Sequence, residues 1–181
     1  MHIRIANAAD ATTIAKLHTD SWLSVYRGVL PDQYLDEKLA QERQQAWVRR
    51  FALPERHQSV FLAEHAGEAV GFACAFGAYD DEYGTQLENL HVHATAKGQG
   101  IGAALVHAVA RWSVQNHPGL GLYLWALTAN TAARRFYEHL GGTVSGSGFW
   151  DSPAGVAVPE VRYSWTDAQD LVSDSPRKAC S

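Results

Sequence analysis

The order of apolar and polar residues divides the N-terminal third of the chain into one strand and two helices. Residues 1–5 alternate between polar and apolar side chains, which is typical of a half-buried strand. The core-facing residues that follow recur at helical spacing: Ile14, Leu17, His18 and Trp22. A second helical pattern covers residues 32–53 and ends at Pro54, which cannot continue a helix. This part of the chain therefore predicts strand, helix, helix.

The remaining two thirds predict six strands and two further helices. Residues 59–64 and 69–76 are joined by a short connection that contains Gly67, so they predict a hairpin. The later segments, in chain order, are a strand at 86–93, a helix at 101–115, a strand at 122–127, a helix at 133–140, and strands at 143–150 and 158–165. The predicted order is β-α-α-β-β-β-α-β-α-β-β.

This order indicates the fold class. Hairpin-joined strands come first and crossover helices come later, so we expect an α/β fold with a mixed, mostly antiparallel sheet and helices on both faces. A chain of 181 residues fits a single domain, which we place at residues 1–166. The polar tail at 167–181 is expected to be frayed.

Composition and charge exclude several classes of protein. A net charge of −4 and a pI near 6.1 give no electrostatic reason to expect nucleic acid or an anionic membrane as a partner. The sequence has no apolar run of the roughly 20 residues that a membrane span needs, and its start does not resemble a signal peptide. Cys74 lies in an apolar run and Cys180 in the tail, so we interpret them as a buried small apolar side chain and a tail thiol. We therefore expect a cytoplasmic protein.

The segment with the clearest chemistry is the glycine-rich loop Lys97-Gly98-Gln99-Gly100-Ile101-Gly102 at the start of a helix. Helix-initial amides have no intrahelical partner, and glycines let a ligand approach the backbone, so such a loop favours phosphate. A dinucleotide site fits poorly, because the next strand ends in Thr128-Ala129-Asn130 and not in an acidic residue. A Walker loop fails for lack of Gly-Lys-Ser/Thr. A glycine-rich helix start without a ligand stays open.

Two motifs resemble the GNAT acyltransferase superfamily. The segment from Leu90 to Leu105 resembles the family's acetyl-CoA signature, in which Gln or Arg precedes Gly-x-Gly/Ala; here Lys97 stands at that position. Residues 130–141 resemble the downstream Asn-x-x-Ala-x-x-Phe-Tyr-x-x-x-Gly segment. The N-terminal residues 21–31 also resemble the opening of many family members. The resemblance implies the acyl-CoA N-acyltransferase fold and acetyl-CoA as co-substrate.

The resemblance also implies which residues bind acetyl-CoA. The backbone of one strand would pair with the pantetheine arm through Leu90, His91 and Val92. The loop would hold the pyrophosphate through Lys97, Gly98, Gln99, Gly100, Ile101 and Gly102. The second motif would contact the pantetheine through Asn130, Ala133 and Phe136. Asn130 is equally well explained as the residue that caps the following helix, and both roles are compatible.

Acetyl transfer to a primary amine needs a group that removes a proton and a group that protonates the leaving thiolate. Glu88, on the strand that leads to the loop, is the first candidate for the base, although an ion-paired strand residue is the alternative. His91 and His93 are further candidates. Tyr137 matches the family's tyrosine beside the thioester and would act as the acid, and the amide of Val92 would polarise the carbonyl oxygen. We expect direct attack without an acyl-cysteine.

The acceptor is the least defined part of the prediction. Aromatic residues that would line its pocket are Trp22, Tyr26, Tyr79 and Trp150, and the acceptor itself would be a small-molecule or peptide amine. No metal is expected, because His91-x-His93 lacks further ligands at recognisable spacing. The alternative function is a non-catalytic acyl-CoA-binding or regulatory domain of the same fold. A homodimer is the default oligomer for a soluble enzyme.

Overall fold

A computed structural model describes residues 1–173 of the chain, which contain a single seven-stranded sheet. The strands are β1 His2–Ile5, β2 Gln58–His65, β3 Glu68–Asp80, β4 Gly84–Val92, β5 Leu122–Leu127, β6 Thr143–Asp151 and β7 Ala157–Trp165. Their spatial order is β1-β2-β3-β4-β5-β7-β6. The pair β4–β5 is parallel and the other five pairs are antiparallel. The predicted fold class is confirmed.

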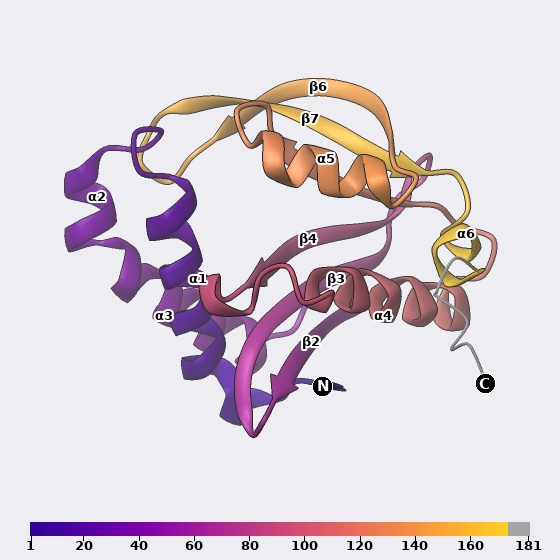
Figure 1. Ribbon diagram of the computed structural model, residues 1–181, viewed down its shortest axis with the longest axis horizontal. Helices are drawn as coiled ribbons and strands as arrows, with labels where there is room; N and C mark the ends of the chain where they lie inside the picture. The colour runs from indigo at the N-terminus through magenta and orange to yellow at the C-terminus, as the bar shows by residue number, and fades with distance from the viewer. Residues whose placement is uncertain (174–181) are drawn as a thin grey trace.

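Helices cover both faces of this sheet (Figure 1). They are α1 Ala11–Val25, α2 Asp32–Glu37, α3 Leu39–Ala52, α4 Ile101–Asn116, α5 Thr131–His139 and α6 Ala168–Ser173, with short 3₁₀ turns η1 Ala8–Asp10 and η2 Ala94–Ala96. Among residues 1–173, no helix is both long enough and apolar enough to cross a membrane.

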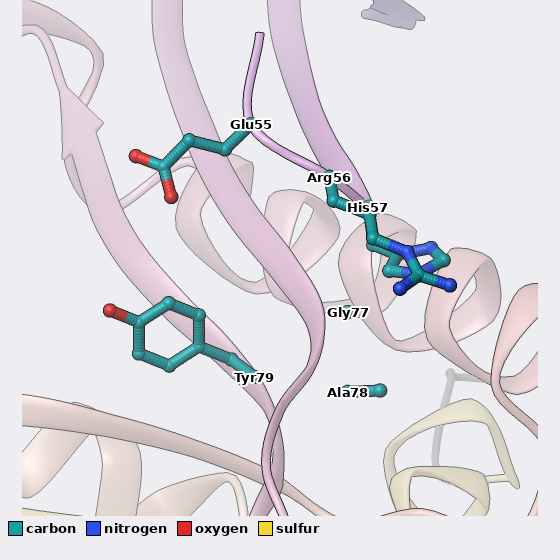
Figure 2. A pocket seen from close by; sticks show the side chains of 6 residues that line it. All are labelled: Glu55, Arg56, His57, Gly77, Ala78 and Tyr79. Atoms are coloured by element: carbon teal, nitrogen blue, oxygen red, sulfur yellow. The ribbon is translucent and has the colours of Figure 1, made fainter.

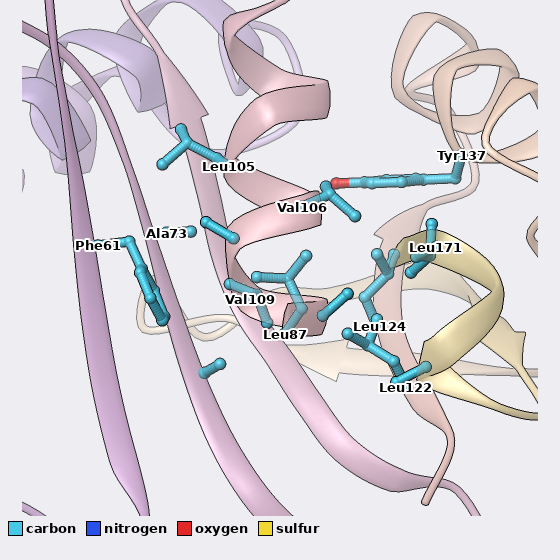
Figure 3. Packing of buried hydrophobic residues seen from close by; sticks show 14 of the residues in the cluster. Phe61, Ala73, Leu87, Leu105, Val106, Val109, Leu122, Leu124, Tyr137 and Leu171 are labelled. Carbon is cyan, nitrogen blue, oxygen red and sulfur yellow. The ribbon is translucent and has the colours of Figure 1, made fainter. Parts of the chain in front are cut away.

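The central strands read as continuous apolar runs because both of their faces are buried. On β2, Val60 and Leu62 pack in one core cluster with α1 and α3, whereas Phe61 and Ala63 pack in another with α4. Successive side chains of a strand point to opposite faces, so a strand between two helical layers needs apolar residues at every position. Figure 3 shows Phe61 and Leu105 of α4 in the second of these clusters.

The second predicted helix is two helices. The pattern at 32–53 predicted one helix, but the structure ends α2 at Glu37 and begins α3 at Leu39. Leu35 and Leu39 on either side of the break are both buried in a third core cluster with Trp22 of α1. The Tyr34 hydroxyl donates to a Glu42 carboxylate oxygen across the break at 2.6 Å. Both halves keep helical spacing, which is why the pattern alone did not show the bend.

The fold extends past the expected boundary at residue 166. Ala168 and Leu171 of α6 are buried in the core cluster that contains α4, and the Ala168 amide donates to the Leu120 carbonyl at 3.1 Å. The expectation that the chain frays from residue 167 is therefore wrong for residues 167–173, because two apolar side chains one helical turn apart anchor this segment. Residues 174–181, with Cys180, lie outside the described residues.

An ion pair attaches the start of α1 to β1. The two terminal guanidinium nitrogens of Arg4 donate to the Asp10 carboxylate at 2.8 Å, and the Asn7 backbone amide donates to the same carboxylate at 2.8 Å. Asn7 in turn accepts from the Ala9 amide, which completes a capping box at the 3₁₀ turn before α1. The hydrogen bonds from Arg4 hold the pKa of Asp10 below its usual value of 3.8.

Candidate active site

The parallel strands β4 and β5 separate soon after they begin. Their register pairs are Thr85 with Leu122 and Gln86 with Tyr123, whereas β4 continues to Val92 and β5 to Leu127. On its other side β4 stays paired with β3 as far as Val92. Among residues 1–173, the β5-facing edge of β4 therefore has no strand partner over residues 87–92, which we call the open edge. An extended ligand can add to such an edge through main-chain hydrogen bonds.

A β-bulge in β4 places Glu88 and Asn89 on the same side of the strand. Cys74 of β3 lies opposite Asn89 and Ala75 lies opposite Leu87, so Glu88 is an extra residue in the ladder. Arg50 of α3 contacts both side chains: its nitrogens donate to the two Glu88 carboxylate oxygens at 2.6 and 3.1 Å and to Asn89 Oδ1 at 3.1 Å. The carboxylate predicted to be the base is held in an ion pair.

The glycine-rich loop has the features of an anion site. Gly98 and Gly100 both have a φ of 77°, a conformation that favours glycine, and a Cβ at either position would meet no atom within 4 Å. Gly100 is the N-cap of α4, where no side chain caps the helix. The first amides of α4 and the positive end of its dipole are thus available to an anion, and the exposed Lys97 precedes them. These features fit the pyrophosphate of a coenzyme A derivative.

Helix α5 packs closely against the first turn of α4. A Cβ on Gly102 would lie 3.3 Å from Phe136 Cζ and 3.9 Å from Val92 Cγ2, so the absence of a side chain at Gly102 permits this approach. Asn130 caps α5 by accepting from the Ala133 amide at 3.1 Å. The capping role expected for Asn130 is thus present in the structure. The open edge, the loop and α5 bring the predicted cofactor residues to one place.

Tyr137 extends from α5 toward α4 (Figure 3) and has 8% of its surface exposed. Its ring contacts Phe136 and Tyr163 at centroid distances of 5.1 and 5.9 Å. Its hydroxyl has no hydrogen-bond partner within residues 1–173, whereas the hydroxyl of Tyr163 bonds Glu138 and Arg134. Burial raises the pKa of Tyr137 above its usual value of 10, so the phenol stays protonated and able to donate.

His91 and His93 have different surroundings. His91 Nδ1 lies 2.8 Å from Ser21 Oγ of α1, and its ring stacks on that of His18 at 4.5 Å. Burial, helped by the charge of Lys97, lowers the pKa of His91 to about 3, so the ring is neutral and a weak base at neutral pH. His93 instead caps the η2 turn through its contacts with Thr95.

Three of the four aromatic residues predicted for the acceptor pocket come together. The ring centroids of Trp22 and Tyr26 of α1 are 4.7 Å apart, and Trp150 of β6 lies 5.5 and 5.6 Å from them. This cluster joins α1 to the ends of β5 and β7 through Leu127 and Val158. Burial, helped by the negative charge of Glu160, raises the pKa of Tyr26 to about 12.

The sequence model of the acetyltransferase (GNAT) family matches residues 15–142, which is more than half of the chain. The chain belongs to this family. It is also 29% identical over 170 residues to the probable N-acetyltransferase Rv2775 of Mycobacterium tuberculosis, across 90% of this chain and 92% of that protein. The resemblance, the fold and the acyltransferase class expected from the sequence are confirmed.

Two solved structures that are similar to this acetyltransferase contain coenzyme A compounds. The yncA structure from Salmonella typhimurium, with its cofactor acetyl-CoA, is 21% identical, covers 99% of both chains and has a TM-score of 0.64. The PaiA N-acetyltransferase of Thermoplasma acidophilum, in complex with coenzyme A, is 16% identical, covers 88% of this chain and 98% of that one, and has a TM-score of 0.68. At these identities the likeness establishes the fold.

Tyr79 does not join the aromatic cluster of this acetyltransferase. Its ring contacts Phe76 at 5.6 Å, and 59% of its surface is exposed. It borders an open cavity of about 450 Å³ (Figure 2), which is lined by Glu55, Arg56, His57, Gly77, Ala78 and Tyr79. This cavity lies away from the open edge and the glycine-rich loop, so we do not assign the acceptor to it. Tyr79 lies at the opposite end of β3 from Gly71, which pairs with Val92, so the structure does not bring it together with the other three aromatic residues.

The structure adds charged residues that were not among the predicted site residues. Arg43, Trp47 and Arg50 of α3 follow an i, i+4, i+7 spacing. This spacing alone could have predicted that the three side chains lie on the same face of the helix. Glu160 of β7 is half-buried, and burial raises its pKa above the usual 4.5. Glu160 lies in register with Leu127 and Gly148. It follows the buried Val158 by two residues, so the side chains of Val158 and Glu160 point to the same face of the sheet.

Proposed function

We propose that this acetyltransferase transfers an acetyl group from acetyl-CoA to a primary amine by direct attack of the amine on the thioester. The observation that carries the proposal is the continuity of three features: the open edge of β4, the glycine-rich loop that follows it, and the uncapped start of α4. Strand addition suits an extended pantetheine arm, and helix-initial amides suit a pyrophosphate.

The residues proposed to hold the cofactor act mainly through their backbones. The pyrophosphate would be held by Lys97, Gly98, Gln99, Gly100, Ile101 and Gly102, and the pantetheine arm by Leu90, His91, Val92, Asn130, Ala133 and Phe136. The His93 amide donates to the Val70 carbonyl of β3 at 2.8 Å. Since successive amides of a strand point to opposite sides, the Val92 amide faces the open edge. It is the donor that we assign to the thioester carbonyl.

Tyr137 is proposed to protonate the leaving thiolate. Acetyl-CoA supplies the activated acyl group, and its departure as a thiolate needs a proton donor or a hydrogen bond. The Tyr137 hydroxyl is free of other described hydrogen bonds, and its raised pKa keeps it protonated, so that it can donate a hydrogen bond to the sulfur as negative charge develops there. A fixed donor that has no competing partner fits this role.

Glu88 is proposed to receive the proton of the acceptor ammonium, directly or through water. A primary alkyl amine is protonated at neutral pH, so it must lose a proton before it attacks. Glu88 lies on the open edge, and its side chain keeps 34% of its surface exposed while Arg50 fixes its orientation. His91 is less suited because its pKa is lowered to about 3.

The experiment that tests the proposed function is a calorimetric titration of the protein with acetyl-CoA, followed by an assay of thiol release with a panel of amines. We expect saturable binding of acetyl-CoA, weaker binding of dephospho-CoA, and none of NAD. Failure to bind acetyl-CoA would overturn the cofactor assignment. Binding of acetyl-CoA without amine-dependent thiol release would favour a non-catalytic domain of the same fold.

A further inference from the structure

A small cavity lies between α3, α1 and the bulge of β4. Its volume is about 60 Å³, and the polar and aromatic residues that line it are His18, Arg43, Trp47, Arg50, Glu88 and Asn89. Figure 1 shows α1 and α3 next to each other, as their contacts also indicate; these two helices and β4 supply the lining residues. We call it the α3 cavity. It borders the open edge through Glu88, which is the proposed proton acceptor, but none of the cofactor-binding residues line it.

His18 contributes an unused hydrogen-bond donor to this region. The Trp47 indole donates to His18 Nδ1 at 3.0 Å, and an indole N–H can only donate, so Nδ1 carries no hydrogen. Burial lowers the pKa of His18 well below 6.5, which leaves the ring neutral with its hydrogen on Nε2. Nε2 is buried and has no hydrogen-bond partner among residues 1–173. An unpaired buried donor is costly unless something accepts from it.

Arg43 contributes a second unused donor and an uncompensated charge. Its Nε is also buried and has no hydrogen-bond partner within the described part of the chain. The guanidinium lies over the Trp22 ring, 4.8 Å from the centroid. No carboxylate in residues 1–173 forms an ion pair with Arg43, whereas Arg50 is neutralised by Glu88. The α3 cavity therefore has one net positive charge.

The charge and size of the α3 cavity limit what fits it. Liquid water takes about 30 Å³ per molecule, so the volume corresponds to about two waters, or to one carboxylate group. Water would satisfy the donors of His18 and Arg43 but would leave the charge of Arg43 without a counterion. A carboxylate meets both requirements, because it accepts several hydrogen bonds and pairs with arginine.

We infer that the α3 cavity binds the carboxylate of the acceptor, so that the acceptor is an amino acid whose free amine lies within a few bonds of that carboxylate. The inference rests on the proposed function, because it concerns the second substrate of that reaction. A carboxylate held by Arg43 and His18 places a neighbouring amine next to Glu88, which lines the same cavity. Monoamines and polyamines lack the group that this cavity recognises.

The experiment compares free amino acids with their primary amides as acceptors, in matched pairs, at saturating acetyl-CoA. The amine of an amide is less basic, so a larger fraction is neutral, and intrinsic reactivity favours the amide. A preference for the acid must therefore come from binding. We expect kcat/KM for the best acid to exceed that for its amide by about 10- to 100-fold, the range of a charge-assisted hydrogen bond.

Variants of α3 test whether Arg43 is responsible. Arg43→Gln should reduce the preference for the acid over the amide to about one, chiefly by raising the KM of the acid. Arg43→Lys should recover part of the preference because it keeps the charge. Arg49→Gln is the matched control, since Arg49 is exposed on the same helix and does not line the cavity. An equal loss for acid and amide in Arg43→Gln would overturn the inference.

A binding measurement decides the inference if no amine in the panel is turned over. The protein with coenzyme A is titrated with N-acetyl amino acids and with their amides. Tighter binding of the acids, lost in Arg43→Gln, supports the α3 cavity; equal binding or no binding of the acids overturns it. If acetyl-CoA itself does not bind, the proposed function fails. If acetyl-CoA binds and amides react as well as acids, only the inference about the α3 cavity fails.

Discussion

The two sides of β4 are built in different ways. Toward β5 lie the open edge and the glycine-rich loop, where backbone groups and the positive φ angles of Gly98 and Gly100 define the surface. Toward α3 lie Arg50, Glu88 and the α3 cavity, where side chains from three elements define it. The first side is suited to the proposed co-substrate acetyl-CoA, and the second to the proposed acceptor. A local sequence motif can specify the side toward β5, whereas the side toward α3 depends on contacts between residues far apart in the sequence.

The largest effect should come from Tyr137→Phe, at the proposed reaction centre between the two sides. We expect kcat to fall by about 10²- to 10⁴-fold, the range for a general acid, with little change in the Kd of acetyl-CoA. Stability should be retained, because the hydroxyl has no described hydrogen bond to lose. Tyr163→Phe is the control: it removes bonds to Glu138 and Arg134 and should lower the Tm while kcat stays near wild type. Full activity of Tyr137→Phe would assign thiolate protonation to another group or to water.

A smaller loss is expected from Glu88→Gln on the α3 side. We predict a fall in kcat/KM of about 10²-fold and loss of the acidic limb of the pH profile, since the amide cannot accept a proton. Glu160→Gln is the comparison, because Glu160 is a second half-buried carboxylate whose pKa is raised by burial. If the acidic limb persists in Glu88→Gln and disappears in Glu160→Gln, Glu160 is the base.

Substitutions of Gly100 test the side of β4 toward β5 alone, where backbone groups would bind the pyrophosphate. Asp and Asn at this position have the same shape and both tolerate a positive φ, so the difference between them isolates the charge. We expect Gly100→Asp to weaken acetyl-CoA binding, measured by calorimetry, about tenfold more than Gly100→Asn. Affinity for the acceptor should change equally in the two variants. Equal affinity of both variants for acetyl-CoA would place the pyrophosphate elsewhere.

The smallest effect concerns the attachment of α1, which carries His18 and Trp22. Asp10→Asn should reduce the free energy of unfolding by about 1.5–3 kcal/mol, the range for hydrogen bonds to a charged group. Because Arg4 lowers the pKa of Asp10, the stabilisation is present above pH 3.8 and is lost as the pH falls through the lower folded-state pKa. Urea titrations should therefore show a constant difference from wild type above about pH 5 that shrinks below about pH 4. A difference that does not depend on pH would exclude the ion pair as its source.

The fold was largely predictable because its signals are local. The apolar run of β2 and the glycines before α4 each specify a conformation within a few residues. The bend at Lys38 was not predictable, because helical spacing continues through it. Helix α6 was missed because Ala168 and Leu171 alone give a weak apolar pattern, and their burial depends on α4.

The candidate site divides along the same lines. Glu88 was identified from its strand, but its pairing with Arg50 joins residues 38 positions apart and follows from tertiary packing. Tyr79 was selected for its residue type and lies at another cavity. Residue type and local spacing thus indicate which groups are available for chemistry, and the packing of helices on the sheet decides which of them meet.

The early separation of β4 from β5 also has a mechanical consequence. Because β4 and β5 have register pairs only at Thr85–Leu122 and Gln86–Tyr123, the sheet divides into two parts, β1 to β4 and β5 to β7, which are joined near one end. A ligand that bonds to β4 and contacts α5 would bridge these two parts of the sheet. In native-state hydrogen exchange, the addition of acetyl-CoA should then slow the exchange of amides in residues 88–92 and in α5 together. The exchange rates of amides in β2 and β3 should change less. At a free ligand concentration of 100 times Kd, binding to the native state adds about 2.7 kcal/mol to the free energy of unfolding.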